Sequence, residues 1–403
     1  MTIGIASPIS PASFAEYLDA ESAILSEGLS SDMAPAVTTL ALEFLEAGHS
    51  LVVFTLDPKA RKAMTLKGEK ITMYVAPSAS SNRVARFFDP FFARNIRFIS
   101  DMFRYNRQKI DVLSVHWTRD YAVAARIFIG KIPVFVTIRD IIPYVLKQQK
   151  MGIRYYNWCI IYLMNEWVLR HKGYNFIANS RYTANCVMQY WGKDVPVIPN
   201  PTLEKYFDIE YNPGNVSEEF KIATISISQP DDKRKNILTL LNAFKLVRMK
   251  CKKVSLYLIG QTFTPENEVI RKWGELGLLD GVTLIGGMKH DDVLDFLSHT
   301  HLMVHPSLEE TFGNTLIEAM AVGCPVLGGE NSGAVPYVLD HGETGYLCDV
   351  TKEDAMADAI LRIMKNPWDA MEKAAKAKEY CRQQFSSKSI AQEYLKLFES
   401  KLR

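Results

Sequence analysis

The sequence has 403 residues, and at roughly 100 to 200 residues per domain this length predicts two domains or three. A composition of 48% hydrophobic and 23% charged residues excludes a disordered chain, and six scattered cysteines without a C-x-x-C pair exclude a zinc knuckle or a disulfide framework. The formal net charge of +2 is uneven: residues 1–50 carry no basic and 7 acidic side chains, residues 51–200 carry 23 and 9, and residues 201–403 carry 24 and 29.

The basic block in residues 51–200 allows two interpretations. Either one face of the first half meets an anionic group, such as phosphate or a lipid surface, or the charges lie on solvated helix faces. Residues 1–50 contain no Lys or Arg, so we expect no export signal. The apolar run at 158–164 is far shorter than the roughly 20 residues of a membrane-spanning helix. A cytoplasmic protein is therefore expected.

The first half of the chain predicts alternating strands and helices. Short apolar runs predict strands at 3–6, 50–55, 71–75, 112–116, 134–137, 176–179 and 195–199. Helical periodicity covers 36–46, which Gly48 ends, and 91–108. Such alternation favours a parallel, doubly wound sheet.

A second round of alternation follows the stiff segment Pro199-Asn200-Pro201, which suits a domain boundary. Strands are expected at 222–227, 254–259, 282–285, 302–304 and 325–327, with helices at 238–249 and 291–298. An amphipathic helix is expected at 387–402. The predicted fold class is α/β, with two Rossmann-like doubly wound domains of about 200 residues each.

The segment 305–320, H-P-S-L-E-E-T-F-G-N-T-L-I-E-A-M, carries the clearest chemistry. A strand ends before a turn at Gly313, and a helix begins near Asn314, so free amides and the helix dipole favour a phosphate there. Glu310 and Glu318 flank this turn and suit hydrogen bonds from sugar hydroxyls on either side of a diphosphate. The alternative is that Glu318 only complements the helix dipole while Glu310 is solvated.

These residues resemble the retaining glycosyltransferases of family four, which have the GT-B fold and an E-x7-E motif within P-S-x-x-E-x-F-G-x-x-x-x-E-A-M. The resemblance implies that Glu310 contacts the hydroxyls of the donor sugar and that Glu318 contacts the ribose. It further implies donor contacts from a wider set, namely Met288, Phe312, Gly313, and the amides of Asn314 and Thr315. Segments 321–326, 332–336 and 342–345 resemble further parts of the family pattern, although Tyr337 stands where a Glu is usual.

Lys235, in K-N-I followed by L-L and A-F, resembles the family's lysine that holds the donor phosphates. Without the resemblance, the local sequence would indicate that Lys235 is a solvated loop residue. The family often has an Arg six residues earlier, where this sequence has Gln229. Lys233 or Arg234 is expected to supply the missing positive charge.

In the first half, residues 111–117 resemble a D-V-I-H-x-H-W strand, and residues 137–140 resemble a T-x-H-D strand end. Arg139 stands where many relatives have a His near the reacting centre, and it cannot accept a proton. It suits a clamp on the phosphate or on an anionic acceptor, and the alternative is an ion pair with Asp140 or Asp120. His116 and Asp140 are expected on the acceptor side, with a buried core histidine as the alternative for His116.

The segment 87–109 alternates aromatic and apolar residues with arginines. They are Phe88, Phe91, Phe92, Ile96, Ile99 and Phe103, and Arg94, Arg97, Arg104 and Arg107, with Arg86 directly before the segment. The pattern suits an anionic membrane surface, or a crossover helix with its apolar side on the sheet. No nucleic-acid-binding signature accompanies the charge. Asp231-Asp232 and Asp291-Asp292 are not D-x-D motifs, so neither a metal nor a cofactor is expected.

Together these features predict a metal-independent glycosyltransferase. Residues 1–200 with the helix 385–403 would bind the acceptor, and residues 201–384 would bind a nucleoside diphosphate sugar, with a UDP-sugar favoured. The sugar would pass, with retention, to a hydroxyl of a glycan or lipid-linked acceptor in cell-surface polysaccharide or glycolipid synthesis, in the cytoplasm or at the inner face of the membrane. The alternatives are a non-catalytic relative that binds nucleotide sugars, and an epimerase or phosphorylase of the same fold.

Overall fold

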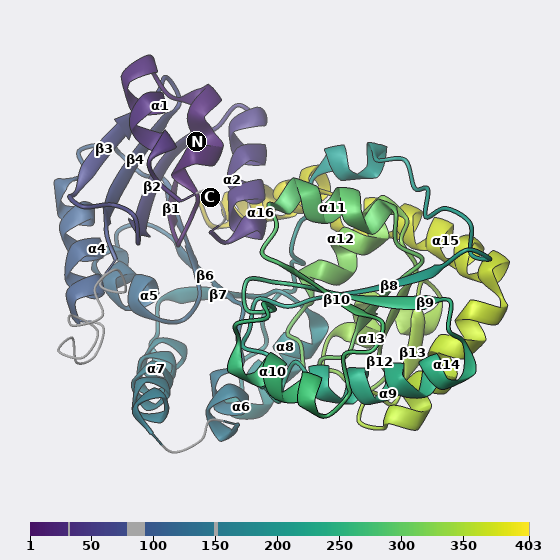
Figure 1. The fold of residues 1–403 in the computed structure, drawn as a ribbon. Coiled ribbons are helices and arrows are strands. Elements are labelled where there is room, and N and C mark those ends of the chain that lie inside the picture. The colour runs from purple at the N-terminus through teal and green to yellow at the C-terminus, as the bar shows by residue number, and fades with distance from the viewer. Residues whose placement is uncertain (31–32, 79–92, 149–151, 403) are drawn as a thin grey trace. The chain divides into compact units, whose positions relative to one another are not determined.

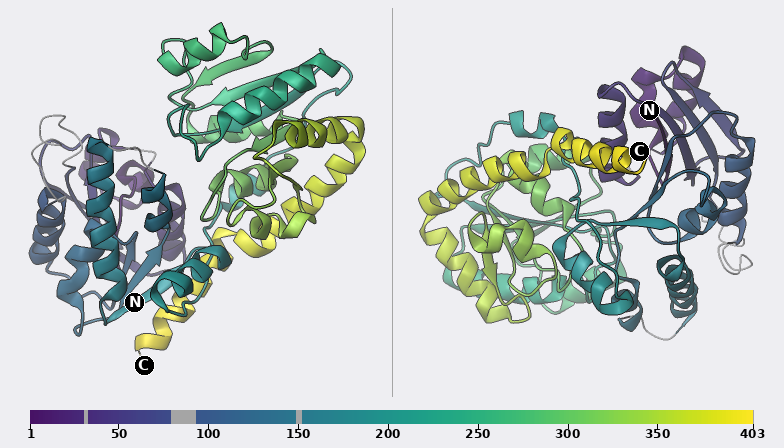
Figure 2. Two further views of the ribbon diagram at one scale, coloured as in Figure 1. Left: turned by 90° about the horizontal axis from the view of Figure 1, so that it is seen from below. Right: turned by 180° about the vertical axis from the view of Figure 1, so that it is seen from behind.

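The computed structural model describes residues 1–30, 33–78, 93–148 and 152–402. The chain divides into two units (Figures 1 and 2): unit 1 comprises Met1–Pro201 and Ser387–Arg403, and unit 2 comprises Thr202–Ser386. Each unit has helices on both faces of a mostly parallel sheet. The predicted α/β fold class is therefore confirmed.

The sheet of unit 1 has seven strands in the order β3-β4-β2-β1-β5-β6-β7, of which only the β3–β4 pair is antiparallel. The strands are β1 Thr2–Ala6, β2 Ser50–Asp57, β3 Met64–Lys67, β4 Ile71–Pro77, β5 Val112–His116, β6 Val134–Ile138 and β7 Tyr174–Ala178. Along β2, Leu51 and Val53 enter one core, while Val52 and Phe54 enter the other. Because successive strand residues face opposite sides, this sheet is buried on both faces.

Helices of unit 1 cover the two faces of its sheet. They are η1 Pro11–Tyr17, α1 Ala20–Glu27, α2 Pro35–Glu46, α4 Ala93–Tyr105, α5 Asp120–Ala125, η4 Arg126–Phe128, α6 Ile142–Lys147, α7 Ile153–Arg170, α8 Arg181–Trp191 and α16 Ser387–Leu402. Helix α16, at the yellow end of the chain, lies against α2 and packs Tyr394 and Phe398 into the core of unit 1 (Figure 1).

Unit 2 has a six-stranded parallel sheet in the order β10-β9-β8-β11-β12-β13. Its strands are β8 Phe220–Ile225, β9 Val254–Ile259, β10 Val282–Gly286, β11 Leu302–His305, β12 Val326–Gly329 and β13 Tyr346–Cys348. Its helices are η5 Glu204–Asp208, α9 Ile237–Lys250, α10 Glu268–Glu275, α11 His290–Ser298, α12 Asn314–Val322, α13 Val335–Val338, η6 Asp340–Gly342, α14 Glu353–Lys365 and α15 Pro367–Phe385. Helices α9 and α14 pack on one face, and α11, α12 and α15 on the other.

The structure differs from the predicted strands at three places. The strand expected at 195–199 is wrong: this segment makes one isolated bridge, Ala178↔Val197, because Pro196 and Pro199 have no amide hydrogen to donate. Strands β3 and β13 were not expected. In β3 only Leu66 is buried, so the hydrophobic pattern of this edge strand is too weak to predict it.

Helix α4 lies within the basic segment 87–109. Arg86, Phe88, Phe91 and Phe92 lie outside the described residues. The side chains of Ile99 and Phe103 are buried in the core of unit 1, which confirms the crossover-helix interpretation for this apolar side. Arg97 and Arg104 are exposed, so contact with an anionic surface stays a prediction. None of the helices in the described ranges has the length and apolar character needed to cross a bilayer.

Candidate active site

The predicted donor residues gather at the carboxyl ends of β8 and β11, two neighbouring parallel strands. From β8 the chain proceeds outward to β9 and β10, then returns to β11 on the other side of β8. This makes the β8–β11 boundary the topological switch point of the sheet, where open α/β sheets bind ligands. Lys235 follows β8 and Glu310 follows β11, so the topology brings together two residues 75 positions apart.

The two loops at this edge are joined by hydrogen bonds. Asn236 has φ +56°, a left-handed conformation that Asn tolerates better than most residues. Its side-chain amide donates to the carbonyl of Pro306 at 3.1 Å and to that of Val350 at 2.8 Å. The backbone amide of Leu308 donates to the carbonyl of Arg234 at 2.8 Å. The loop that carries Lys235 is therefore fixed against the loop that carries Glu310.

Lys235 and Glu310 form an ion pair at the centre of the site. The Lys235 Nζ to Glu310 Oε1 distance is 2.5 Å, and the two side chains are 16% and 13% exposed. Burial by itself raises the pKa of Glu310, but the charge of Lys235 and the hydrogen bond from His305 outweigh burial and hold this pKa well below its ordinary value. Glu310 is therefore ionised, and the expectation of a merely solvated carboxylate does not describe it.

His305, the last residue of β11, orients Glu310. Its Nε2 lies 3.2 Å from Glu310 Oε1, and its Nδ1 lies 3.3 Å from Thr315 Oγ1. A carboxylate only accepts hydrogen bonds, so Nε2 carries the proton and Nδ1 accepts from the Thr315 hydroxyl. Lys235 and His305 both contact Oε1. Among the described residues, none donates a hydrogen bond to Glu310 Oε2, which leaves this oxygen for another partner.

The turn before α12 requires a glycine. Gly313 has φ +94°, and a Cβ there would lie 2.7 Å from Leu316 Cδ1. Gly313 is also the N-cap of α12, and as a glycine it has no side chain that could cap this helix. The amide groups at the start of α12, from Asn314 onward, therefore suit an anion.

Glu318 lies one turn into α12 and is the end of a chain of hydrogen bonds that runs through His290 to Tyr206. His290 Nε2 lies 3.0 Å from Glu318 Oε1, and Tyr206 Oη lies 3.0 Å from His290 Nδ1. By the same argument, His290 donates to Glu318 from Nε2 and accepts from the Tyr206 hydroxyl. Burial, followed by the charges of Glu318 and Asp291, raises the pKa of Tyr206, so this hydroxyl keeps its proton.

The remaining predicted donor residues lie around the same edge. Arg234 is half-buried, and its guanidinium makes no hydrogen bond or ion pair with any described residue. Lys233 and Gln229 are exposed, and Met288 is half-buried in the loop before α11. The Phe312 side chain is 1% exposed and packs against Phe385, so a donor contact at this position would use its backbone.

In unit 1, Arg139 and His116 form a buried cluster. The Arg139 Nε and Nη2 atoms lie 3.2 and 3.1 Å from His116 Nδ1, and Nη1 donates to Asn200 Oδ1 at 2.5 Å. Burial, followed by the charge of Arg139, holds the pKa of His116 well below its ordinary value, so this His is neutral. His116 is fully buried, which agrees with the core-histidine alternative, while Asp140 is half-buried.

Contacts of His116, Arg139 and Asp140 with an acceptor or phosphate stay predictions. The sequence interpretation missed His305, His290 and Tyr206 as contributors to the donor site. The rule that ligand residues follow the carboxyl ends of strands points to the first two, since His305 ends β11 and His290 comes shortly after β10.

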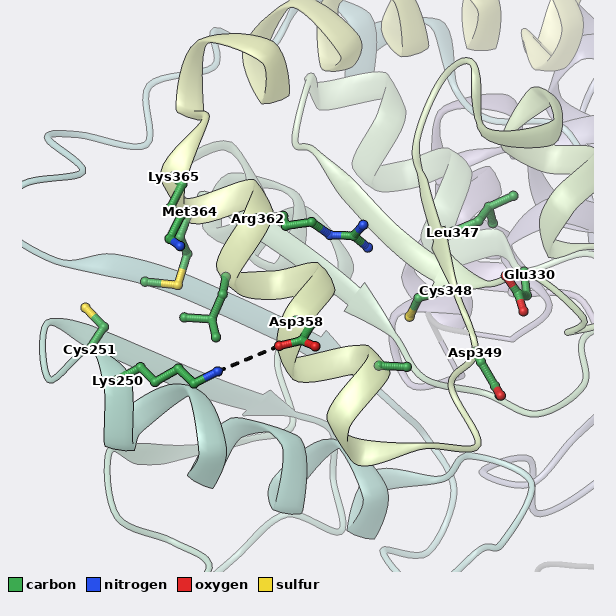
Figure 3. A pocket seen from close by; sticks show the side chains of 12 residues that line it. Lys250, Cys251, Glu330, Leu347, Cys348, Asp349, Asp358, Arg362, Met364 and Lys365 are labelled. Carbon is green, nitrogen blue, oxygen red and sulfur yellow. Dashed lines mark ion pairs between the residues drawn. The ribbon is translucent and has the colours of Figure 1, made fainter.

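A cavity of about 960 Å³ lies elsewhere in unit 2, bordered by α9, α14 and the ends of β12 and β13 (Figure 3). It contains an ion pair between Lys250 and Asp358 at 3.7 Å, and because both side chains are about two-thirds exposed this pair contributes little stability. None of the predicted donor residues lines this cavity. Within the described ranges, no group of three His, Cys, Asp or Glu side chains is arranged to hold a metal ion.

Two family models match the chain. "Glycosyltransferase Family 4" matches residues 33–202, and "Glycosyl transferases group 1" matches residues 216–384. An N-acetyl-alpha-D-glucosaminyl L-malate synthase of Bacillus anthracis is 32% identical over 172 residues, which are 42% of this chain and 44% of the relative. The gpi3 subunit of a phosphatidylinositol N-acetylglucosaminyltransferase of Schizosaccharomyces pombe is 28% identical over 52% of this chain and 44% of the relative. The aligned region thus spans less than half of these relatives.

Solved structures resemble the whole chain in fold. A sucrose-phosphate synthase of Thermosynechococcus elongatus has a TM-score of 0.75 at 18% identity, covering 99% of this chain and 98% of that chain. HepE of Anabaena, solved in complex with UDP-glucose, has a TM-score of 0.66 at 18% identity, covering 99% of this chain and all of that chain. At these identities the likeness concerns the fold alone.

Proposed function

Because the chain belongs to the GT-B glycosyltransferases of family four, we propose that it transfers a glycosyl group from a nucleoside diphosphate sugar to a hydroxyl group. The observation that carries this proposal is the buried Lys235–Glu310 pair at the switch point of unit 2, close in sequence to the start of α12. A cation, the amide groups at the start of α12 and an ionised carboxylate at one edge match the parts of such a donor.

The proposed donor contacts follow from charge. Lys235, the guanidinium of Arg234 and the first amides of α12 attract the diphosphate, whose negative charge grows as its bond to the sugar breaks. Glu310 accepts hydrogen bonds from sugar hydroxyls through Oε2. Glu318, oriented by His290, accepts hydrogen bonds from the ribose.

The proposed reaction keeps the configuration of the anomeric carbon. The bond from this carbon to the diphosphate oxygen breaks, a bond to the acceptor oxygen forms on the same face, and the acceptor proton passes to the departing phosphate. Glu310 is held by Lys235 and His305 through one oxygen. This arrangement suits a fixed hydrogen-bond acceptor rather than a covalent nucleophile, so we propose front-face transfer without a bound metal.

We propose a UDP-sugar as the donor and a glycan or lipid-linked hydroxyl as the acceptor, with unit 1 as the acceptor unit. Support comes from the UDP-glucose complex of HepE and from two relatives whose names contain an N-acetylglucosaminyl group, a synthase and a subunit of a transferase. Unit 1 carries 27 basic and 18 acidic side chains, and unit 2 carries 20 and 27. This excess of positive charge favours a location at an anionic membrane surface facing the cytoplasm.

The test is release of nucleoside diphosphate from a panel of UDP-, GDP- and ADP-sugars. We expect turnover with one of these donors, and a loss of about 100- to 1,000-fold in Lys235→Ala and Glu310→Gln, since each removes a group that acts on the reacting centre. Lys250→Ala, in the cavity of Figure 3, serves as a lysine control and should keep full activity. Equal activity of all four proteins would refute the proposed site.

The second candidate is a binding protein without turnover. Gln229 and Arg139 replace residue types that are common in the active sites of relatives, and this difference favours a loss of catalysis. Tight donor binding in a thermal-shift assay, without product from any acceptor in a broad panel, would support this candidate. Appearance of a different sugar nucleotide or a sugar phosphate would instead indicate an epimerase or phosphorylase.

A further inference from the structure

Helix α7 of unit 1 is apolar on two opposite sides (Figure 1). Its inner side buries Ile161, Val168 and Leu169 within the unit. Its outer side carries Tyr156 and Leu163, which are 64% and 62% exposed. A helix that is apolar on all sides is usually buried on all sides. The outer side of α7 therefore suits a partner.

The outer side forms one stripe, which we call the α7 stripe. It consists of Tyr156, Ile160, Leu163 and Trp167, at intervals of 4, 3 and 4 residues. Because each residue turns an α-helix by about 100°, these four side chains start within about 60° of one another. Trp167 is 37% exposed, and Ile160 is half-buried. Such spacing is that of the a and d positions of a coiled coil, which pack into a facing helix.

The α7 stripe is complementary to itself. Its intervals read 4, 3 and 4 in both directions, so a second copy of α7 that runs antiparallel presents the same pattern. A two-fold axis then sets Ile160 opposite Leu163 of the second copy, and Tyr156 opposite Trp167. Interfaces in which one patch meets itself across a two-fold axis are the commonest kind in homo-oligomers.

The charges of α7 favour a protein partner over a lipid surface. Among its 18 residues, the charged ones are Arg154, Glu166 and Arg170. Glu166 accepts hydrogen bonds from Arg170 Nε and from Trp191 Nε1, each at 2.9 Å. A helix that lies on an anionic membrane has a polar face rich in Lys and Arg. Depletion of charge together with aromatic side chains is instead typical of the core of a protein interface.

The exposed area predicts a weak pair. The bond from Trp191 brings α8 beside α7, and Met188 and Tyr190 of α8 are 47% and 38% exposed. At about 200 Å² for an aromatic side chain and about 100 Å² for Leu or Met, these two residues and the α7 stripe offer roughly 400 Å² of apolar surface per chain. Two such patches, with the half-buried side chains beside them, approach the roughly 1,000 Å² at which specific interfaces begin.

We propose that the chain forms a two-fold homodimer, in which the α7 stripe of one copy packs antiparallel on the α7 stripe of a second copy. The inference is independent of the proposed function, since α7 carries none of the residues proposed to contact the donor or the acceptor. For an interface of this small size, we expect half of the chains to be paired at about 10–100 µM.

The test is sedimentation velocity of the full chain from about 1 to 500 µM, in reducing buffer because the cysteines are free. The weight-average mass should rise from that of one chain toward that of two. Leu163→Glu brings two carboxylates close to the two-fold axis, so we expect it to weaken pairing about 30-fold or more through lost apolar contact and repulsion. Ile24→Glu is the control. Ile24 lies on α1 of the same unit and is 69% exposed, so this change should leave pairing unaffected.

A pair of opposite charges distinguishes a second copy from other partners. Leu163→Lys should also be monomeric, because the two positive charges repel each other near the axis. An equimolar mixture of Leu163→Lys and Leu163→Glu should associate about tenfold more tightly than either variant alone. Since Leu163 is exposed, both variants should keep the circular dichroism spectrum and the unfolding midpoint of the wild type.

Three results would overturn the inference. They are a wild-type chain that stays monomeric over the whole concentration range, an Ile24→Glu variant that loses as much affinity as Leu163→Glu, and a mixture that associates no better than its components. Binding of a monomeric wild type to phosphatidylglycerol vesicles, lost in Leu163→Glu, would also overturn it and would assign this face of α7 to a lipid surface.

Discussion

At Glu310, burial and charge act in opposite directions on one carboxyl group, and the charge of Lys235 prevails. Removal of Lys235 would leave a nearly buried carboxylate without its counter-ion. We therefore expect Lys235→Ala to lower the free energy of unfolding by about 3 kcal/mol. The double variant Lys235→Ala/Glu310→Gln should be more stable than Lys235→Ala alone. Urea unfolding of the four proteins in the cycle measures both effects, and strictly additive losses would contradict the pairing.

The same ion pair sets a pH dependence. Since the pKa of Glu310 is lower in the folded chain than its ordinary 4.5, its ionised form stabilises the fold above pH 4.5, and this contribution is lost as the pH falls further. The stability advantage of the wild type over Glu310→Gln should therefore be constant near neutral pH and shrink below pH 4.5. An advantage that grows on acidification would show that Glu310 is protonated in the folded state.

The relay of Tyr206 and His290 predicts a positioning effect at Glu318. In His290→Phe the carboxylate loses its donor, and we expect UDP to bind about tenfold more weakly, as for the loss of one oriented charged hydrogen bond. The preference of the protein for UDP over 2′,3′-dideoxy-UDP should also fall, because Glu318 is proposed to contact the ribose hydroxyls that the analogue lacks. Calorimetry with both nucleotides measures this. His299→Phe is the control, since His299 directly follows the same helix and makes no contact with Glu318.

Among helices and loops, the turn at Gly313 joins local strain to ligand binding. Ala at this position would meet Leu316 and would have to keep φ near +94°. We expect a loss of about 1–2 kcal/mol in stability together with weaker UDP binding, because the first amides of α12 would turn away from the phosphate. Gly277→Ala is the control in the same unit. Gly277 also has a positive φ of +65°, so an alanine there is strained as well, but the space around it is open. This control should lose stability without losing affinity for UDP.

Local pattern predicted those parts of the site that lie within one loop. The strand–glycine–helix order around Gly313 is visible in the sequence, and α12 begins at the expected Asn314. The pairing of Lys235 with Glu310 was not predictable from local chemistry, since it depends on β8 lying next to β11. Similarly, the contacts of Arg139 with His116 and Asn200, 23 and 61 residues away, were not predictable from its sequence neighbours. Long-range neighbours follow from topology, which spacing alone does not encode.

At the scale of the whole chain, its last helix completes the unit formed by its first residues. Tyr394 of α16 is fully buried, and its hydroxyl lies 3.1 Å from Thr137 Oγ1 on β6. Its ring packs beside Phe44 and Phe398, at centroid distances of 6.4 and 5.8 Å. Unit 1 therefore depends on residues that are synthesised after all of unit 2.

We expect Tyr394→Ala to destabilise unit 1 by about 3–5 kcal/mol, because it removes a large buried ring and leaves a cavity. Amide hydrogen exchange should accelerate in β5, β6 and α2, the elements next to this ring, while the strands of unit 2 keep their protection and UDP binding is unchanged. Leu402→Ala, at an exposed position on the same helix, should leave both units unaffected. Equal acceleration in both units would mean that they unfold as one cooperative body, and that α16 stabilises more than the unit into which it packs.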